Sequence, residues 1–441
     1  MEIFIKVLQV ITCFSLLVLV HEFGHFLFAK LFHTRVEKFY LFFNPWFSIF
    51  KFRIGETEYG MGWVPFGGYC KIAGMVDESM DTDQMKSEPQ PWEYRSKPAW
   101  QRLLIIVGGV LMNILLAIVI YIGITYTWGD SYIKTKDVEH GFMFSEVAHE
   151  IGFRDGDKIL TVEGEYVDNY AQIPSLILLD DARQVQVERG GETVTVTIDP
   201  KYIKSMLKDK SFLTLRTPFV VGKVAPEGGA AAAGLMAGDS LVAVDSVPMR
   251  WFDEFRTAFA DHKGDTAVVT FVRGGETLTA SVPVSAEGQV GVYLAGVNLA
   301  NLYPISTREY SFLEAIPVGC GRAFTSIGSY LKQLKLIVSP ETEAYKSVGG
   351  IIAMGNFFPG QWDWLSFWQI TALISIMLAV LNILPIPMLD GGHMVFILYE
   401  MITRRTPSDK FMERAQLVGM IIVFGIVILA NGNDIIKLIF K

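Results

Sequence analysis

The stretch Leu16-Leu17-Val18-Leu19-Val20-His21-Glu22-Phe23-Gly24-His25-Phe26-Leu27-Phe28-Ala29 determines how the rest of the chain is interpreted. Its centre has the spacing H-E-x-x-H, and residues four apart share one face of a helix, so both imidazoles would point to one spot. Neutral imidazoles are good zinc ligands, and the Glu22 carboxylate between them is a candidate general base. The run 10–20 before the motif is almost wholly apolar. The motif is therefore expected at membrane depth, where polar residues are costly and usually functional.

Composition indicates a membrane protein with few spans. The 441 residues are 51% hydrophobic and 19% charged, and the mean hydropathy is +0.34. This chain is too apolar for an ordinary soluble protein and too polar for a transporter with many spans, so we expect a few spans and a water-soluble part of about 150–200 residues. The net charge of −8 gives no signal for nucleic-acid binding. The three cysteines are far apart and indicate neither a disulfide framework nor a cysteine zinc site.

Four apolar segments are long enough to cross a hydrocarbon core about 30 Å thick. We expect spans at 1–32, 99–128, 367–395 and 411–436. The first is expected to be retained, because no A-x-A-like cleavage site follows it. Lys and Arg gather in the loops after the first and third spans. The positive-inside rule therefore predicts that these loops are cytoplasmic and that both termini and the long region between spans two and three lie outside.

Residues 36–75 are expected to form β-structure associated with the membrane, followed by a solvated acidic loop over 76–98. The runs 39–43 and 46–50 are strand-like, a further strand over 57–64 follows a turn at Gly55, and Pro65-Phe66-Gly67-Gly68-Tyr69 has the composition of a strong turn. The segment is too short to span and too aromatic for a free loop. A hairpin or re-entrant sheet packed against the spans fits best, and a surface hairpin with no catalytic role is the alternative.

The region outside the membrane contains an internal repeat. Residues 148–164 recur as 230–246, and Arg189-Gly190-Gly191-Glu192 recurs later as Arg273-Gly274-Gly275-Glu276. Two elements in the same order predict two small β-rich domains, at 129–216 and 217–305. The shared pattern A-x-x-x-G-[FL]-x-x-G-D resembles circularly permuted PDZ domains, which bind extended peptides by adding a strand to a sheet edge. A rigid spacer or steric plug is the alternative role.

The segment after the repeats is expected to be an amphipathic helix within 306–340, because its apolar side chains recur at helical spacing. It would lie on the outer membrane–water boundary or pack on the second repeat. Residues 341–366 would link it to the third span.

A third metal ligand is needed, because a catalytic zinc usually has three protein ligands and an open position for water. Asp390 is the foremost candidate. It borders an apolar run, follows two prolines that break the helix, and precedes two glycines that allow close backbone approach. A helix cap is its alternative role, and His393 is a rival ligand or a supporting interfacial histidine. Asn113 and Asn382, at membrane depth in spans two and three, would bond substrate or oxyanion, or join helices.

Together these motifs resemble the site-2 protease family of intramembrane zinc metalloproteases, and most closely its bacterial RseP type with two tandem PDZ domains. The resemblance covers essentially the whole chain. It implies zinc ligands at His21, His25 and Asp390, with Glu22 as the base that takes a proton from water and passes it to the leaving amine. It also implies that the 36–72 region presents substrate as an extended strand and that the PDZ-like pair excludes substrates with bulky outside domains.

Further positions match the family less firmly. Asn382, Pro385 and Pro387 correspond to residues implicated in substrate handling, and Gly67 and Gly68 belong to the matching P-x-G-G-Y motif. The family often has G-P-x-x-N in the second span. Here the sequence is Gly109-Val110-Leu111-Met112-Asn113, so the asparagine is present and the proline is not.

The sequence and this resemblance together predict a multi-domain, multi-pass protein with about four transmembrane helices, a membrane-associated β-hairpin region and two PDZ-like domains. The resemblance implies that this protein lies in the bacterial inner membrane, with these domains on the periplasmic side. Its expected activity is zinc-dependent cleavage of the transmembrane segments of single-span proteins in the lipid bilayer. An anti-sigma factor trimmed beforehand by an upstream site-1-type protease is the expected substrate, and remnant signal peptides are also compatible. The rivals are a non-catalytic scaffold or chaperone and a transporter, which the absence of an inverted repeat in the sequence disfavours.

Overall fold

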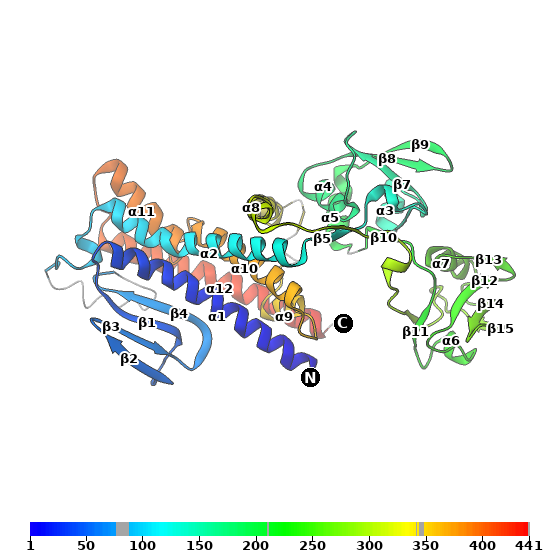
Figure 1. Cartoon of the computed structure of the whole chain (residues 1–441), viewed down its shortest axis with the longest axis horizontal. Helices are drawn as coiled ribbons and strands as arrows, with labels where there is room; N and C mark the ends of the chain where they lie inside the picture. Colours follow the sequence, from blue (N-terminus) through cyan, green and yellow to red (C-terminus); the bar gives the residue numbers. More distant parts are fainter. Residues whose placement is uncertain (76–87, 210, 341, 344–347, 440–441) are drawn as a thin grey trace. The chain divides into compact units, whose positions relative to one another are not determined.

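The computed structural model describes residues 1–75, 88–209, 211–340, 342–343 and 348–439, which form two compact units (Figure 1). One unit comprises Met1–Gly129 with Glu309–Lys441, and the other is Asp130–Arg308. Parts of the acidic loop expected at 76–98 and of the linker expected at 341–366 lie outside the described residues.

Four helices of the described residues are long and apolar enough to cross a membrane. They are α1 (Glu2–Leu31), α2 (Ala99–Trp128), α10 (Trp364–Ile383) and α12 (Asp409–Ile439). This confirms a membrane protein with four candidate spans. α2 is unbroken through Val110, which stands in place of the proline. The third apolar segment is not one helix: α10 ends at Ile383, residues 384–389 are irregular, and α11 (Asp390–Thr403) begins after the two prolines.

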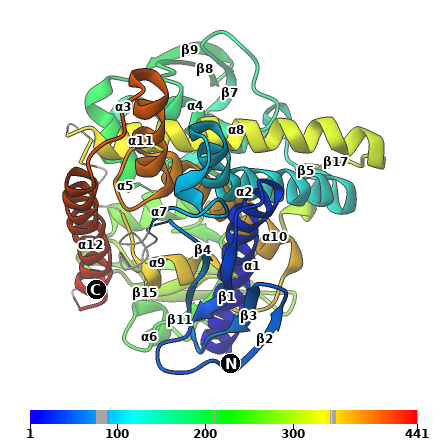
Figure 2. The ribbon, with the colours of Figure 1, turned by 90° about the vertical axis from the view of Figure 1, so that its left-hand side faces the viewer.

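A four-stranded sheet lies beside α1 (Figure 2). Its strands are β1 (Val36–Phe43), β2 (Phe50–Ile54), β3 (Thr57–Met61) and β4 (Val64–Ile72), in the order β2-β3-β1-β4. β1 pairs parallel with β3 and antiparallel with β4. Phe26 of α1 packs against Phe39 and Tyr59, with ring centroids 5.3 and 6.0 Å away. Among the described residues β4 is an edge strand of this sheet, and it lies against α1.

Two expectations for this region are wrong. Residues 44–49 form a loop rather than a strand, because Trp46 adopts a φ of 71° and its ring stacks on Trp63, 6.0 Å away. The predicted turn at Pro65–Tyr69 lies inside β4. Gly67 there has a φ of 115°, and the register with β1 shifts between Leu41 and Phe43. The turn-forming residues therefore produce a bulge in a strand that continues.

The amphipathic segment forms α8 (Phe312–Val338), which packs on α2 and α10. Gly319 lies against the backbone of Ile122, and the hydroxyls of Tyr121 and Ser326 are 3.1 Å apart. Figure 1 shows α8 nearly end-on and α2 lengthwise, so the two helices cross. The sequence analysis expected this helix at the membrane–water boundary or on the second repeat, and it did not predict packing on α2 and α10. A short helix, α9 (Ile351–Phe357), follows and contacts α1 and α12.

The second unit contains two repeats that share the succession strand, helix, strand, helix, strand, strand and a closing strand; among the described residues an additional helix, α5, occurs only in the first repeat and an additional short strand, β13, only in the second. The first consists of β6 (Phe142–Phe144), α3 (Glu146–Ile151), β7 (Lys158–Val162), α4 (Ile173–Leu179), β8 (Gln184–Arg189), β9 (Glu192–Thr197), α5 (Ile203–Lys208) and β10 (Leu213–Leu215). The second consists of β11 (Val221–Val224), α6 (Gly229–Ala232), β12 (Ser240–Val244), β13 (Val247–Pro248), α7 (Phe252–Asp261), β14 (Thr266–Arg273), β15 (Glu276–Pro283) and β16 (Val292–Leu294). β5 (Asp130–Tyr132) pairs with β17 (Ser306–Arg308), which joins the two ends of the unit.

The two motif elements of each repeat contact each other. In the first repeat Arg189 donates to both carboxylate oxygens of Asp157 at 2.8 and 2.7 Å. In the second, Arg273 makes the same pair of bonds to Asp239, both at 2.7 Å. Each arginine also donates to the carbonyl of the preceding motif glycine. The repeat seen in the sequence is thus a repeated tertiary contact.

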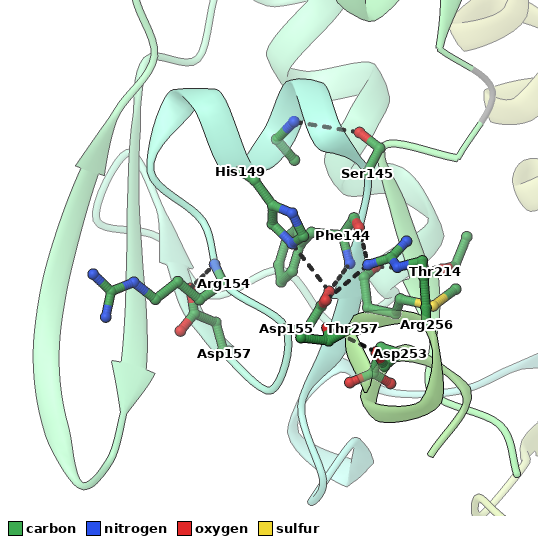
Figure 3. A network of polar contacts seen from close by, with 12 residues as sticks. Phe144, Ser145, His149, Arg154, Asp155, Asp157, Thr214, Asp253, Arg256 and Thr257 are labelled. Carbon is green, nitrogen blue, oxygen red and sulfur yellow. Dashed lines mark hydrogen bonds and ion pairs between the residues drawn. The ribbon is translucent and has the colours of Figure 1, made fainter. Parts of the chain in front are cut away.

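Polar contacts also join the two repeats (Figure 3). Asp155 of the first repeat accepts a hydrogen bond from the backbone N–H of Phe144 at 2.7 Å and one from Arg256 of α7 at 2.8 Å. His149 Nε2 lies 3.2 Å from the same carboxylate. Asp253, which lies on α7 like Arg256, pairs with Arg216, which precedes the second repeat. One charged helix face of the second repeat is therefore held by the first.

Candidate metal centre

Helix α1 presents His21 and His25 on one face, as their spacing predicts. Their Nε2 atoms are 3.2 Å apart. The Nδ1 atom of His25 lies 2.9 Å from the backbone carbonyl of Ile105 in α2. Because a carbonyl oxygen can only accept, His25 carries its proton on Nδ1 and turns the lone pair of Nε2 toward His21.

Asp390, the first residue of α11, approaches both histidines. Its Oδ2 atom is 3.3 Å from His21 Nε2 and 3.6 Å from His25 Nε2. In the part of the chain that the structure describes, these three side chains are the one group whose ligand atoms could hold a metal ion, all within 4.8 Å of one another. Oδ2 is buried and makes no hydrogen bond of good geometry among the described residues. Two imidazole nitrogens and a carboxylate oxygen in need of a partner are the donor set of a catalytic zinc.

The loop before α11 positions Asp390 by folding back on the start of that helix. A Cβ atom on Gly391 would lie 2.1 Å from the carbonyl oxygen of Leu384, and one on Gly392 would lie 2.6 Å from that of Ile386. Any side chain at either position would push the loop away from α11 and move Asp390. The close approach that the two glycines predict is therefore present.

Helix α2 passes directly beside the two imidazoles. A Cβ atom on Gly109 would lie 2.5 Å from His25 Nε2 and 2.6 Å from His21 Cε1. The sequence pattern indicates no role for Gly109 beyond its place in the second-span motif, and its spacing to Asn113 is the signal that could have found it.

Two asparagines contact His21. The Nδ2 atom of Asn113 lies 3.4 Å from His21 Nδ1, and that of Asn382 lies 3.4 Å from His21 Nε2. Asn113 is fully buried, and its backbone carbonyl accepts a bond of 2.7 Å from the Ser375 hydroxyl of α10. Both asparagines thus border the metal centre.

A cavity of about 530 Å³ opens beside the centre. It is lined by His21, Glu22, His25 and Asp390, by residues 68–72 of β4, and by Lys38, Phe43, Met75, Met388 and His393. Because five consecutive residues of β4 line it, the cavity runs along this edge strand. It provides space for an extended peptide next to the candidate base.

Some of the predicted substrate-handling residues line this cavity and others do not. Gly68 lines it, whereas Gly67, Pro385 and Pro387 do not belong to its described lining. Gly67 lies at the bulge of β4, and both prolines lie in the loop before Asp390. Sequence reasoning missed Lys38, Tyr69 and Lys71, since their place beside the centre depends on the register of β1 and β4.

Comparisons with known proteins agree with this geometry. The profile described as peptidase family M50 matches residues 9–426. A Neisseria meningitidis protein provisionally named as a zinc metalloprotease is 28% identical, over 97% of this chain and 98% of its own length. The regulator of sigma E protease of Haemophilus influenzae and the regulator of sigma-E protease RseP of Escherichia coli are each 26% identical, both over 97% of this chain and 98% of their own.

Proposed function

The chain belongs to peptidase family M50 and is a zinc metalloprotease of the membrane, and we propose that it cleaves peptide bonds within the membrane-spanning segments of other proteins. The observation that carries this proposal is the convergence of His21, His25 and Asp390 from helices that are themselves apolar enough to span a membrane or directly follow one that is. The peptide bonds that such a centre reaches lie in the membrane.

We assign the zinc ligands to His21 and His25 of α1 and to Asp390 of α11. The buried Oδ2 of Asp390 and the two adjacent Nε2 atoms supply the donors. Zinc held there would activate a water molecule and polarise the scissile carbonyl. Glu22, which lines the same cavity, would take the proton of that water and deliver it to the leaving amine.

A substrate helix must unwind before cleavage, because its carbonyls are bonded internally. Among the described residues β4 is the edge strand of its sheet and lines the cavity, so an unwound segment that runs along the strand beside Gly68 would lie across the centre. Asn382, whose Nδ2 lies 3.4 Å from His21 Nε2, would hold the segment beside the centre, and Pro385 and Pro387 would act through the loop that positions Asp390. This geometry favours an extended substrate.

The substrates we propose are single-span membrane proteins. The sigma-E regulator names of two relatives support an anti-sigma factor, shortened beforehand by a site-1-type protease, and remnant signal peptides fit the same site. The tandem repeats, which we infer to be PDZ-like, would exclude substrates with bulky outer domains. The distribution of Lys and Arg supports the bacterial inner membrane, with both termini and the repeats on the periplasmic side.

Replacement of Glu22 by glutamine tests the proposal. A tagged panel of single-span proteins is co-expressed with the unaltered chain or with Glu22→Gln, and zinc is measured in both purified proteins. We expect cleavage to be lost while zinc is retained, and Asp390→Asn to lose zinc as well. Cleavage that survives in Glu22→Gln would contradict the role of Glu22. A zinc-free chain that still stabilises single-span proteins would instead support the rival, a scaffold.

A further inference from the structure

We propose that Asn113 is a positioning residue: its side-chain oxygen accepts the Nδ1–H of His21, which fixes the ring so that Nε2 faces the metal. The inference rests on the proposed function in taking His21 as a metal ligand. It assigns Asn113 to the support of the centre rather than to the substrate or the oxyanion.

The contacts of His21 determine which ring nitrogen faces the centre. Its Nε2 lies 3.2 Å from His25 Nε2 and 3.3 Å from Asp390 Oδ2. A nitrogen binds a cation through its lone pair, so Nε2 must be unprotonated. The neutral ring then carries its proton on Nδ1.

The His21 side chain is only 14% exposed, so its Nδ1–H needs an acceptor. His21 Nδ1 faces the Asn113 side chain. The Nδ2 atom of Asn113 lies 3.4 Å away, while its Oδ1 is buried with no hydrogen-bond partner among the described residues. Both Nδ2 and Nδ1–H are donors in the metal-binding tautomer, so they cannot bond to each other. A half-turn of the carboxamide, whose two ends have nearly the same shape, brings Oδ1 to the ring and resolves the conflict.

His25 shows the same arrangement with a different acceptor. Its Nδ1 lies 2.9 Å from the carbonyl of Ile105, also in α2. Ile105 and Asn113 are eight residues apart, about two turns, and so lie on one face of that helix. α2 therefore supports both rings from behind, one through a backbone oxygen and the other through a side-chain oxygen. The bond from Ser375 to the Asn113 carbonyl, 2.7 Å long, anchors this part of α2 to α10.

Two substitutions separate an acceptor from a donor. Asn113→Asp keeps the acceptor oxygens and removes the N–H groups, whereas Asn113→Leu has a similar size and neither function. If Asn113 donated to substrate or oxyanion, both variants would lose that function. If it accepts from His21, only the leucine variant loses the function, because a carboxylate behind a zinc-bound histidine supports the ring equally well.

The test measures zinc affinity of the full-length protein in detergent, by competition with a chromophoric chelator, and the visible spectrum of its Co²⁺ form. We expect Asn113→Leu to bind zinc about 10- to 100-fold more weakly than the unaltered protein, and Asn113→Asp to stay within about threefold of it. Asn113→Ala replaces the leucine variant if that does not fold, as judged by the unfolding midpoint of the metal-free protein.

Two outcomes would overturn the inference. One is equal loss of zinc affinity in the aspartate and leucine variants. The other is full zinc affinity and an unchanged Co²⁺ spectrum in Asn113→Leu, with cleavage lost. Failure of the proposed function is recognised separately, since a parent chain that binds zinc and cleaves no membrane segment would refute that proposal and leave the Asn113 comparison intact.

Discussion

Replacing Gly109 by alanine is expected to disable the metal centre while leaving the membrane helices folded. The added Cβ would lie 2.5 Å from His25 Nε2 and 2.6 Å from His21 Cε1. Ordinary van der Waals contact begins near 3.4 Å, so the His25 ring would have to withdraw by about 0.9 Å, the difference between these distances. The ring has little freedom to do so, because the Ile105 carbonyl holds its other nitrogen.

A displacement of this size exceeds what a metal site tolerates. Ligand distances are held within about 0.2 Å in well-formed sites. Displacing a catalytic group by about 1 Å can cost a factor on the order of 100 in rate. We therefore expect Gly109→Ala to weaken zinc binding at least about 10-fold and to lower the cleavage rate about 100-fold.

The matched control is Gly123→Ala in the same helix, where an added Cβ would meet no heavy atom within 4 Å. Zinc content, the unfolding midpoint of the metal-free protein and cleavage of a single-span substrate in liposomes are measured for both variants. The control should resemble the unaltered protein in all three, and Gly109→Ala should differ in zinc content and cleavage. If Gly109→Ala kept zinc and activity at the level of Gly123→Ala, the packing argument would be refuted.

Two further predictions concern the unit outside the spans. Asp155→Asn should weaken the contact with Arg256 by about 1 kcal/mol, because an ion pair at a partly exposed site becomes a hydrogen bond from the guanidinium to a neutral amide oxygen. Hydrogen exchange should then rise at both repeats while zinc affinity stays unchanged. A rise confined to one repeat would contradict the stabilising role of this contact between them. A bond to the Ala258 carbonyl and the neighbouring Asp245 carboxylate raise the pKa of His262 above its ordinary 6.5. The folded chain therefore binds this proton more tightly, so the stabilisation is complete below about pH 6.5 and is lost as the pH rises through the raised pKa; unfolding midpoints from about pH 5 to 9 should show this fall, and His262→Gln should remove it.

The parts of the site that the sequence predicts are those set by local rules. The spacing of His21 and His25 fixes their common face whatever surrounds the helix. Asp390 could be predicted because a carboxylate between helix-breaking prolines and two glycines, at the end of an apolar run, needs a partner. The four apolar helices follow from length and hydropathy alone. None of these inferences needs knowledge of what lies next to what.

The predictions that failed, or could not be made, concern features that depend on tertiary neighbours. The run Pro65–Tyr69 has the residues of a turn, yet β1 and α1 hold it extended, and only the bulge at Gly67 records the local preference. The amphipathic pattern of α8 shows which face is apolar but not that α2 covers it. Gly109 is one glycine among forty, and its importance is visible only when the two histidine rings are placed beside it.

The partners of the buried carboxylates support the assignment of a metal centre independently of any motif. Asp157 and Asp239 are each 1% exposed and Asp253 is 2% exposed, and each is paired with an arginine. Asp434, at 5%, accepts the backbone N–H of Ala353 near the start of α9. Asp390 faces two imidazoles instead, and among the described residues its buried Oδ2 is left without a hydrogen bond. A buried carboxylate requires compensation. Since the described residues provide no arginine here, a bound cation would complete the charge balance, and two adjacent imidazole nitrogens would select zinc over the harder cations that prefer oxygen ligands.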